Sequence, residues 1–144
     1  MTPAQPPSSA PSSASAAPQM SGALPAGEGP ARVLVVDDDA ILRGLVASML
    51  DLLGFEPVTA STGEEALARL SEGLAPSWVI LDMDMPGMGG AAALPRMRQL
   101  QPGLRIIIAT GRVTPTVLDL VSSHTQVDLL PKPFGLRDLR QKLA

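Results

Sequence analysis

The chain has no cysteine and no tyrosine, and aromatic residues account for 2% of its 144 residues. The absence of cysteine excludes disulfides, thiolate metal sites and cysteine nucleophiles. No apolar run approaches the about 20 residues that a membrane-spanning helix needs. A net charge of −3 provides no general attraction to nucleic acid or to anionic lipid. We therefore expect a cytoplasmic protein that binds neither membranes nor, directly, nucleic acid.

Residues 1–30 contain few large apolar side chains and a single charged side chain, that of Glu28. Proline, alanine, serine and glycine dominate this segment. Such a composition does not bury enough apolar surface to offset the entropy that is lost on ordering. We therefore predict a disordered N-terminal tail over 1–30. The remaining length has room for a single modest core, so we expect one domain over 31–144.

The rest of the chain alternates short apolar runs with amphipathic segments. Short β-branched runs that are bounded by turn signals are typical of strands buried on both faces. The predicted strands are 32–36, 56–61, 79–81, 104–109 and 127–130, and the predicted helices are 41–53, 62–70, 89–101, 114–121 and 135–144. This alternation predicts an α/β fold with a parallel sheet that is covered by helices on both faces. Pro95 indicates that the third helix either begins late or is kinked.

Polar side chains follow four of these strands at the points where the strands end. They are Asp37, Asp38, Asp39, Asp82, Asp84, Thr110 and Lys132. Because the carboxyl ends of parallel strands meet at one edge of a sheet, we expect most of them to lie close together. Asp39 stands where the first helix starts, so we interpret it as a helix cap.

The residue types in this group indicate a particular chemistry. Carboxylates that gather in one place raise one another's pKa unless a cation neutralises them. Oxygen ligands without histidine or cysteine favour Mg²⁺. The hydroxyl of Thr110 and the ammonium of Lys132 are suitable donors to phosphoryl oxygens. The sequence therefore predicts Mg²⁺-assisted phosphoryl transfer onto a carboxylate.

Four segments together resemble the receiver domains of two-component response regulators. They are Val33–Asp39, Leu81–Gly87, Thr110–Gly111 and Lys132–Phe134, and the resemblance includes the spacing between them. It covers about residues 31 to 144. The resemblance implies a flavodoxin-like fold of five strand–helix units, a doubly wound parallel sheet with strand order 2-1-3-4-5 and helices on both faces.

The resemblance also implies roles for individual residues. By position, Asp82 corresponds to the residue that accepts the phosphoryl group. Asp37, Asp38 and Asp82 correspond to ligands of Mg²⁺, with Asp38 in direct contact and Asp37 acting through water. The backbone carbonyl of Asp84 corresponds to a further ligand.

The remaining positions correspond to the switching part of these domains. Thr110 matches the hydroxyl that turns toward the phosphoryl group, and Lys132 matches the lysine that pairs with it. Leu129 stands at the switch position where the family often has tyrosine or phenylalanine, so rotation of an aromatic ring cannot operate here. We hypothesise that Arg112 offsets the charge of the Asp84 side chain across the mouth of the site, and that this pair tunes the lifetime of the phosphoryl group.

These observations predict a single-domain response regulator. It would accept a phosphoryl group on Asp82 from a sensor histidine kinase or a phosphotransfer protein in a phosphorelay, and signal by altered binding of a downstream protein partner. It would not be an enzyme beyond promoting its own phosphorylation and dephosphorylation. Two alternatives remain open: an interaction module that does not use phosphorylation, and a haloacid-dehalogenase-type phosphohydrolase with Asp82 as nucleophile and Asp84 as acid/base.

Overall fold

The computed structural model of the protein describes residues 29–85 and 89–144. The tail predicted over 1–30 falls almost entirely outside these residues, and so does the end of the Leu81–Gly87 segment, at Pro86 and Gly87. Residues Arg32–Ala144 form one structural unit. No helix in the described parts of the chain is long and apolar enough to span a membrane.

Five parallel strands form the sheet, in the order β2-β1-β3-β4-β5. They are β1 (Arg32–Val36), β2 (Glu56–Ala60), β3 (Trp78–Asp82), β4 (Arg105–Thr110) and β5 (Val127–Pro131). This arrangement confirms the predicted flavodoxin-like fold and its strand order. In the register of the sheet, Val36 lies opposite Leu81 and Asp82 lies opposite Ala109. The carboxyl ends of β1, β3 and β4 are therefore level with one another in the middle of the sheet.

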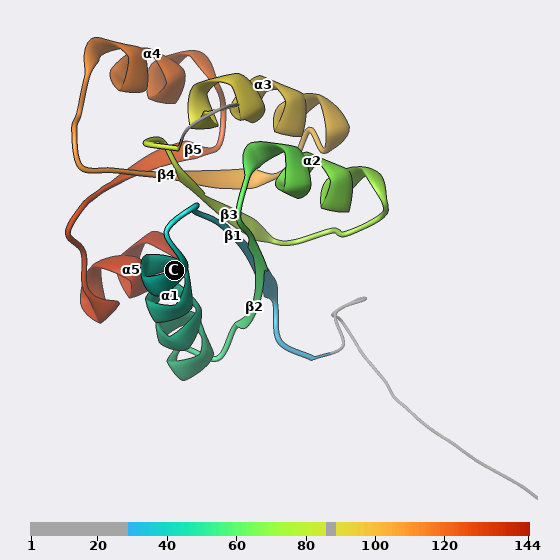
Figure 1. Cartoon of the computed structure of the whole chain (residues 1–144), viewed down its shortest axis with the longest axis vertical. Helices are drawn as coiled ribbons and strands as arrows, with labels where there is room; N and C mark the ends of the chain where they lie inside the picture. Colours follow the sequence, from blue (N-terminus) through green and yellow to red (C-terminus); the bar gives the residue numbers. More distant parts are fainter. Residues whose placement is uncertain (1–28, 86–88) are drawn as a thin grey trace, which may run out of the picture. The chain divides into compact units, whose positions relative to one another are not determined.

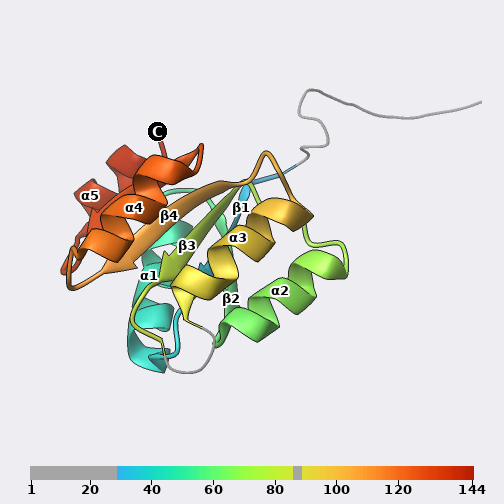
Figure 2. The same ribbon diagram turned by 90° about the horizontal axis from the view of Figure 1, so that it is seen from above.

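Five helices cover the two faces of the sheet. They are α1 (Ala40–Leu52), α2 (Gly63–Ser71), α3 (Gly90–Leu100), α4 (Pro115–Ser123) and α5 (Leu136–Lys142). Helices α1 and α5 lie on one face, and α2, α3 and α4 lie on the other (Figures 1 and 2). Each crossover returns the chain to the same edge of the sheet, as the parallel strands require.

Each face of the sheet buries its own apolar cluster. Because successive side chains of a strand point to opposite faces, Leu34 and Leu81 pack under α2, α3 and α4, whereas Val35 and Ile80 pack under α1 and α5. All four side chains are buried. The strands are therefore apolar on both faces, which is why their sequences show continuous apolar runs rather than alternation.

Helix α3 differs from one of the two predicted alternatives, because it begins at Gly90 and contains Pro95 in its interior. A late start near Pro95 is therefore wrong. The proline removes one helical hydrogen bond, but Ala93, Leu94 and Met97 are completely buried against the sheet. This packing holds the helix together across the proline.

Side chains cap the first two helices, and the cap of α1 is the one that the sequence predicts. Asp39 caps α1, since its Oδ1 accepts from the amides of Ile41 (3.0 Å) and Leu42 (3.2 Å). The hydroxyl of Thr62 caps α2 by accepting from the amide of Glu65 (2.9 Å). Glu65 reaches back one residue further than a capping box requires, to the amide of Ser61 (2.8 Å).

Two arginine side chains stabilise the amino-terminal edge of the sheet through hydrogen bonds and stacking. Arg98 of α3 donates to the carbonyls of Leu104, Pro102 (2.9 Å) and Thr125 (2.6 Å), which joins α3 to the segment that enters β5. The guanidinium of Arg105 stacks over the ring of Trp78 at 4.9 Å from its centroid. This edge lies at the opposite end of the strands from the predicted site.

Candidate functional site

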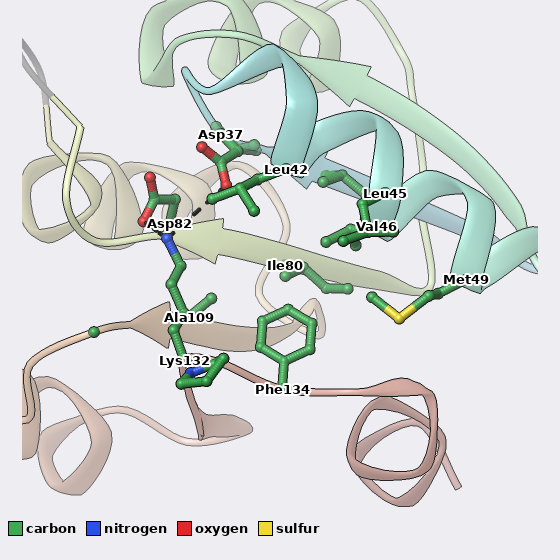
Figure 3. Close-up of a pocket in the computed structure, with 14 residues that line it drawn as sticks. Asp37, Leu42, Leu45, Val46, Met49, Ile80, Asp82, Ala109, Lys132 and Phe134 are labelled. Carbon is green, nitrogen blue, oxygen red and sulfur yellow. Dashed lines mark hydrogen bonds and ion pairs between the residues drawn. The ribbon is translucent and has the colours of Figure 1, made fainter.

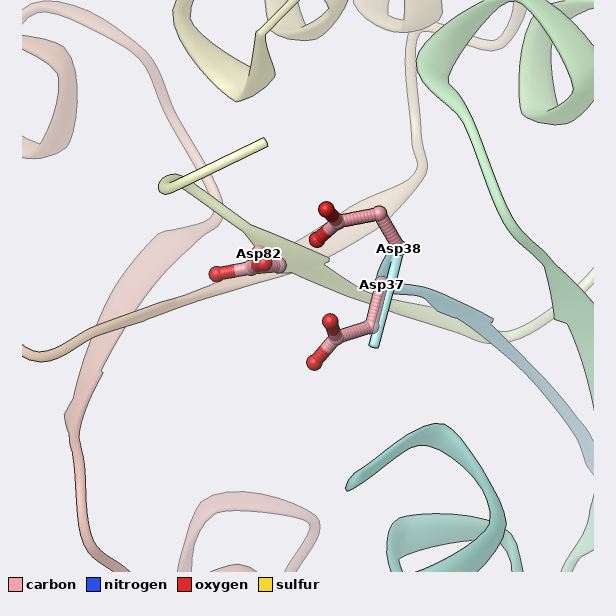
Figure 4. Close-up of side chains that lie close together, drawn as sticks. All are labelled: Asp37, Asp38 and Asp82. Carbon is pink, nitrogen blue, oxygen red and sulfur yellow. The ribbon is translucent and has the colours of Figure 1, made fainter. Parts of the chain in front are cut away.

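The centre of the site is a group of three carboxylates. Asp37 and Asp38 directly follow β1, and Asp82 is the last residue of β3. One oxygen from each carboxylate lies within 4.8 Å of the others. Asp37 and Asp82 are buried, Asp38 is exposed, and all three gather at the carboxyl edge of the sheet (Figure 4). The structure thus brings together residues that are more than forty positions apart in the sequence.

Lys132 is the cation of the site and follows β5 directly. Its Nζ lies 2.8 Å from Oδ1 of Asp82 and 4.0 Å from Oδ2 of Asp37. The amide of Lys132 also donates to the carbonyl of Thr110 (2.8 Å), which fixes its backbone beside β4. Burial lowers the pKa of Lys132, but its hydrogen bond to Asp82 and the nearby carboxylates outweigh burial, so the pKa is raised. Lys132 is therefore a charged donor that points at Asp82.

Asp37 is held in place by its own turn and by α1. Its Oδ1 accepts from the amide of Asp39 (2.9 Å), and its carbonyl accepts from Nη1 of Arg43 (2.7 Å). Burial raises the pKa of Asp37 and the charge of Asp82 adds to this, whereas the hydrogen bond from Asp39 and the ammonium of Lys132 act in the opposite direction. A bound cation would relieve this crowding of negative charge.

The arrangement around Asp84 differs from the predicted pairing with Arg112. Oδ2 of Asp84 accepts from the amide of Gly111 (3.3 Å), and the amide of Asp84 donates to Oδ1 of Asp82 (3.1 Å). Within residues 29–85 and 89–144, Asp84 and Arg112 form no ion pair. The predicted charge offset is therefore not accompanied by an ion pair in these residues, and it stays a prediction. A backbone amide partner leaves no trace in a one-letter sequence.

Two residues of the predicted switch lie on neighbouring strands. The Thr110 side chain is buried, and its hydroxyl donates to the carbonyl of Arg112 (2.8 Å) and accepts from the Arg112 amide (3.0 Å). The hydroxyl is therefore not bonded to Asp82 in this structure. Leu129 lies in β5, half-buried, and packs against the apolar cluster under α2, α3 and α4.

An apolar cavity of about 440 Å³ opens beside the charged group. Asp37, Asp82 and Lys132 stand at one end of it, and side chains of α1 and the sheet line the rest (Figure 3). Leu42 and Leu45 on its α1 side are 38% and 55% exposed, so apolar surface reaches solvent next to the site. Sequence reasoning missed both this cavity and the role of Arg43. The helical spacing of the α1 leucines is apparent in the sequence, but the solvent exposure of two of them is not.

The model of one protein family, the response regulator receiver domain, matches residues 33–144. The chain is 39% identical over 112 residues to protein-glutamate methylesterase/protein-glutamine glutaminase 1 of Paramagnetospirillum magneticum, and the match covers 75% of this chain and 29% of that protein. It is 37% identical over 109 residues to a CpxR homologue of Haemophilus influenzae, a transcriptional regulatory protein, covering 75% of this chain and 46% of the relative. The chain thus spans less than half the length of these relatives.

Solved structures of similar fold include two that the match covers almost completely. Chemotaxis protein CheY4 of Vibrio cholerae is 29% identical with a TM-score of 0.73, covering 80% of this chain and 97% of that chain. The response regulator TrrA of Thermotoga maritima, solved in complex with Mg²⁺ and BeF, is 32% identical with a TM-score of 0.69, covering 78% of this chain and 96% of that chain.

The relatives correct one prediction and leave another without support. The prediction that the protein is not an enzyme is overturned, because similar proteins include methylesterases, in which the match covers a minor part of the length. The absence of direct nucleic acid binding stays a prediction, because a transcriptional regulatory protein is also among the relatives.

Proposed function

Because the chain belongs to the response regulator receiver domain family of two-component signalling, we propose that Asp82 accepts a phosphoryl group from a phosphohistidine. The donor would be a sensor histidine kinase or a phosphotransfer protein. One observation carries the proposal: Asp82 is a buried carboxylate whose Oδ1 lies 2.8 Å from the ammonium of Lys132, beside two further carboxylates at the carboxyl edge of the sheet.

The donor set fits Mg²⁺. Three carboxylate oxygens lie within 4.8 Å of one another. They are hard ligands, and three of them leave coordination positions of the ion for water and phosphate. We propose that Asp37, Asp38 and Asp82 hold the ion together with the carbonyl of Asp84. Bound there, Mg²⁺ would neutralise charge on the transferring phosphoryl group.

The residues of the chain would divide the work of transfer. An oxygen of Asp82 attacks phosphorus as the bond from phosphorus to the histidine nitrogen breaks, and the electron pair of that bond stays on the nitrogen, which then takes a proton from solvent. Lys132 donates to a phosphoryl oxygen, and its position beside Asp82 requires little movement. The hydroxyl of Thr110 would exchange its bond to the Arg112 carbonyl for a phosphoryl oxygen.

The donor protein must reach Asp82 along an exposed surface. The apolar cavity ends at Asp82, and Leu42 and Leu45 present apolar surface next to it. We propose that the donor contacts this part of α1. Movement of Thr110 would then shift the β4–α4 region between two populations and alter the binding of a downstream partner. We further propose that residues 31–144 form the signalling domain and that the protein is cytoplasmic.

The experiment is phosphorylation of the full chain by acetyl phosphate, followed by intact mass. We expect one phosphoryl group per chain with Mg²⁺, none with EDTA, and none for Asp82→Asn. Asp128→Asn is the matched control, because Asp128 is an exposed carboxylate of β5 that pairs with Lys142 of α5, and its loss should leave labelling unchanged. Labelling that persists in Asp82→Asn would refute the assignment.

Two other outcomes separate the alternatives. Absence of labelling with acetyl phosphate, phosphoramidate and phosphorylated donor domains alike would favour an interaction module that does not use phosphorylation. Continuous release of phosphate from a phosphoester, lost in Asp84→Asn, would favour a phosphohydrolase.

A further inference from the structure

Asp84 connects the two loops that border the site. Its Oδ2 accepts from the amide of Gly111 (3.3 Å) on the β4–α4 loop, while its own amide donates to Asp82 (3.1 Å). In the described parts of the chain, no other side-chain hydrogen bond joins the β3–α3 loop to the β4–α4 loop. One carboxylate, next to the nucleophile, therefore holds the loop that carries Thr110.

The loop held by Asp84 keeps the Thr110 hydroxyl away from Asp82. That hydroxyl is engaged twice with the backbone of Arg112, at 2.8 Å to its carbonyl and 3.0 Å to its amide. The Thr110 side chain is also buried, at 1% exposure. An inward turn of this hydroxyl breaks both of its bonds to the Arg112 backbone. The contact from Asp84 to Gly111, the residue between Thr110 and Arg112, holds that backbone in the position in which both bonds form.

We propose that Asp84 is a latch, in which its carboxylate occupies the Gly111 amide and holds the β4–α4 loop until Asp82 carries a phosphoryl group. The release step rests on the proposed function. A phosphoryl group carries about −1.5 to −2 charges and three acceptor oxygens. Attached to Asp82, it repels the Asp84 carboxylate. It also competes for the Gly111 amide, which borders the same cavity as Asp82.

Gly111 suits this exchange of one anion for another. Gly111 is exposed, and apart from its chain neighbours no atom lies within 4 Å of the place where a Cβ would stand, so there is space beside it for either acceptor. Asp84 then acts through Gly111 on Thr110, as a positioning residue. An asparagine at position 84 keeps an acceptor but loses the charge that drives release, whereas an alanine loses both.

The first test uses the metal-free, unphosphorylated chain and follows the Gly111 amide by ¹⁵N NMR and hydrogen exchange. We expect Asp84→Ala to speed exchange of this amide about tenfold, the effect of losing one hydrogen bond to a charged group, and Asp84→Asn to speed it less. Asp51→Ala, at an exposed position of α1 with the same change in charge, should have no effect. Exchange in Asp84→Ala within twofold of the wild type would refute the latch.

The second test adds Mg²⁺ and beryllium fluoride as a stand-in for the phosphoryl group. We expect the Gly111 and Thr110 signals of the wild type to move on loading. In Asp84→Ala the unloaded signals should already lie part of the way toward the loaded positions, and in Asp84→Asn the movement should be smaller. Equal movement in all three proteins would refute release by repulsion.

The two tests fail separately. If the wild type takes up no beryllium fluoride, the proposed function and the release step both fall, while the contact measured in the first test stands or falls by itself. If phosphorylation proceeds but hydrogen exchange of the Gly111 amide does not depend on the residue at position 84, the latch alone is wrong.

Discussion

Asp37 is a buried carboxyl whose pKa is raised, first by burial and further by the charge of Asp82. A carboxyl with a raised folded-state pKa binds its proton more tightly in the folded chain. The ionised form therefore destabilises the fold above that pKa, and the penalty vanishes as pH falls to the ordinary value of 3.8. Ionisation of Asp37 therefore costs stability, as expected of a group that would serve a cation.

We expect Asp37→Asn to be more stable than the wild type at pH 7 without metal, with a difference that shrinks as pH falls toward 4. Urea denaturation at both values measures it. Asparagine keeps an acceptor for the Asp39 amide, so the change isolates the charge. Added Mg²⁺ should stabilise the wild type and narrow the gap. A variant less stable than the wild type at pH 7 would show that the carboxylate is net favourable without a cation.

Lys132→Met should have the opposite effect. Loss of the ammonium leaves Asp82 buried without its charged donor at 2.8 Å, at a cost of about 2 kcal/mol in the free energy of unfolding. The pKa of Lys132 is raised above its ordinary value of 10.5, so the contribution of the ammonium is complete below 10.5 and is lost as pH rises through the raised pKa. Urea denaturation should therefore show a smaller difference between the two proteins at pH 11 than at pH 7.

At the scale of elements, α3 packs unusually closely on the end of β3. A Cβ at Gly90 would stand 2.8 Å from the carbonyl oxygen of Asp82 and 2.9 Å from Sδ of Met83. The sulfur can move, but the backbone carbonyl cannot move without displacing Asp82. The close approach of α3 therefore depends on glycine at this position.

We expect Gly90→Ala to lower the free energy of unfolding by about 1–3 kcal/mol, as overpacking does. Gly44→Ala is the matched control, because Gly44 lies inside α1 and nothing stands within 4 Å of its Cβ position. That change should raise stability by about 0.5–1 kcal/mol. Chemical denaturation of both variants tests the signs, and a neutral Gly90→Ala would mean that α3 yields at no cost.

Pro95 offers a second test at this scale. Its position six residues into α3 removes the hydrogen bond to the carbonyl of Ala91, and its side chain is exposed. We expect Pro95→Ala to stabilise the protein by about 1–3 kcal/mol by restoring that bond. Thermal denaturation measures the gain. An unchanged melting temperature would indicate that packing of Leu94 and Met97 dictates the local geometry with or without the bond.

Elements and site differ in how far the sequence predicts them. Strands and helices follow from apolar runs and caps such as Asp39, which are local. The convergence of Asp37, Asp82 and Lys132 follows from the rule that parallel strands end at one edge. Contacts such as Arg43 with the Asp37 carbonyl and Asp84 with the Gly111 amide involve backbone groups that every residue carries. No residue type marks them, so the sequence alone pairs Asp84 with the visible charge of Arg112.

At the scale of the whole molecule, Arg32–Ala144 holds both apolar clusters and every site residue. We expect a chain of residues 31–144 to unfold at the same temperature as the full chain and to bind Mg²⁺ equally well. Differential scanning calorimetry with and without Mg²⁺ measures both. A lower melting temperature of the shorter chain would assign residues 1–30 a stabilising role.

Trp78 gives the molecule a particular optical property. It is the only tryptophan, the chain has no tyrosine, and the guanidinium of Arg105 covers its ring. Trp78 starts β3 and Asp82 ends it, a separation of about 13 Å at 3.3 Å per residue. The intrinsic fluorescence therefore comes from one emitter at the amino-terminal edge. We expect this fluorescence to change when the sheet unfolds and to remain constant when a cation binds at the opposite edge.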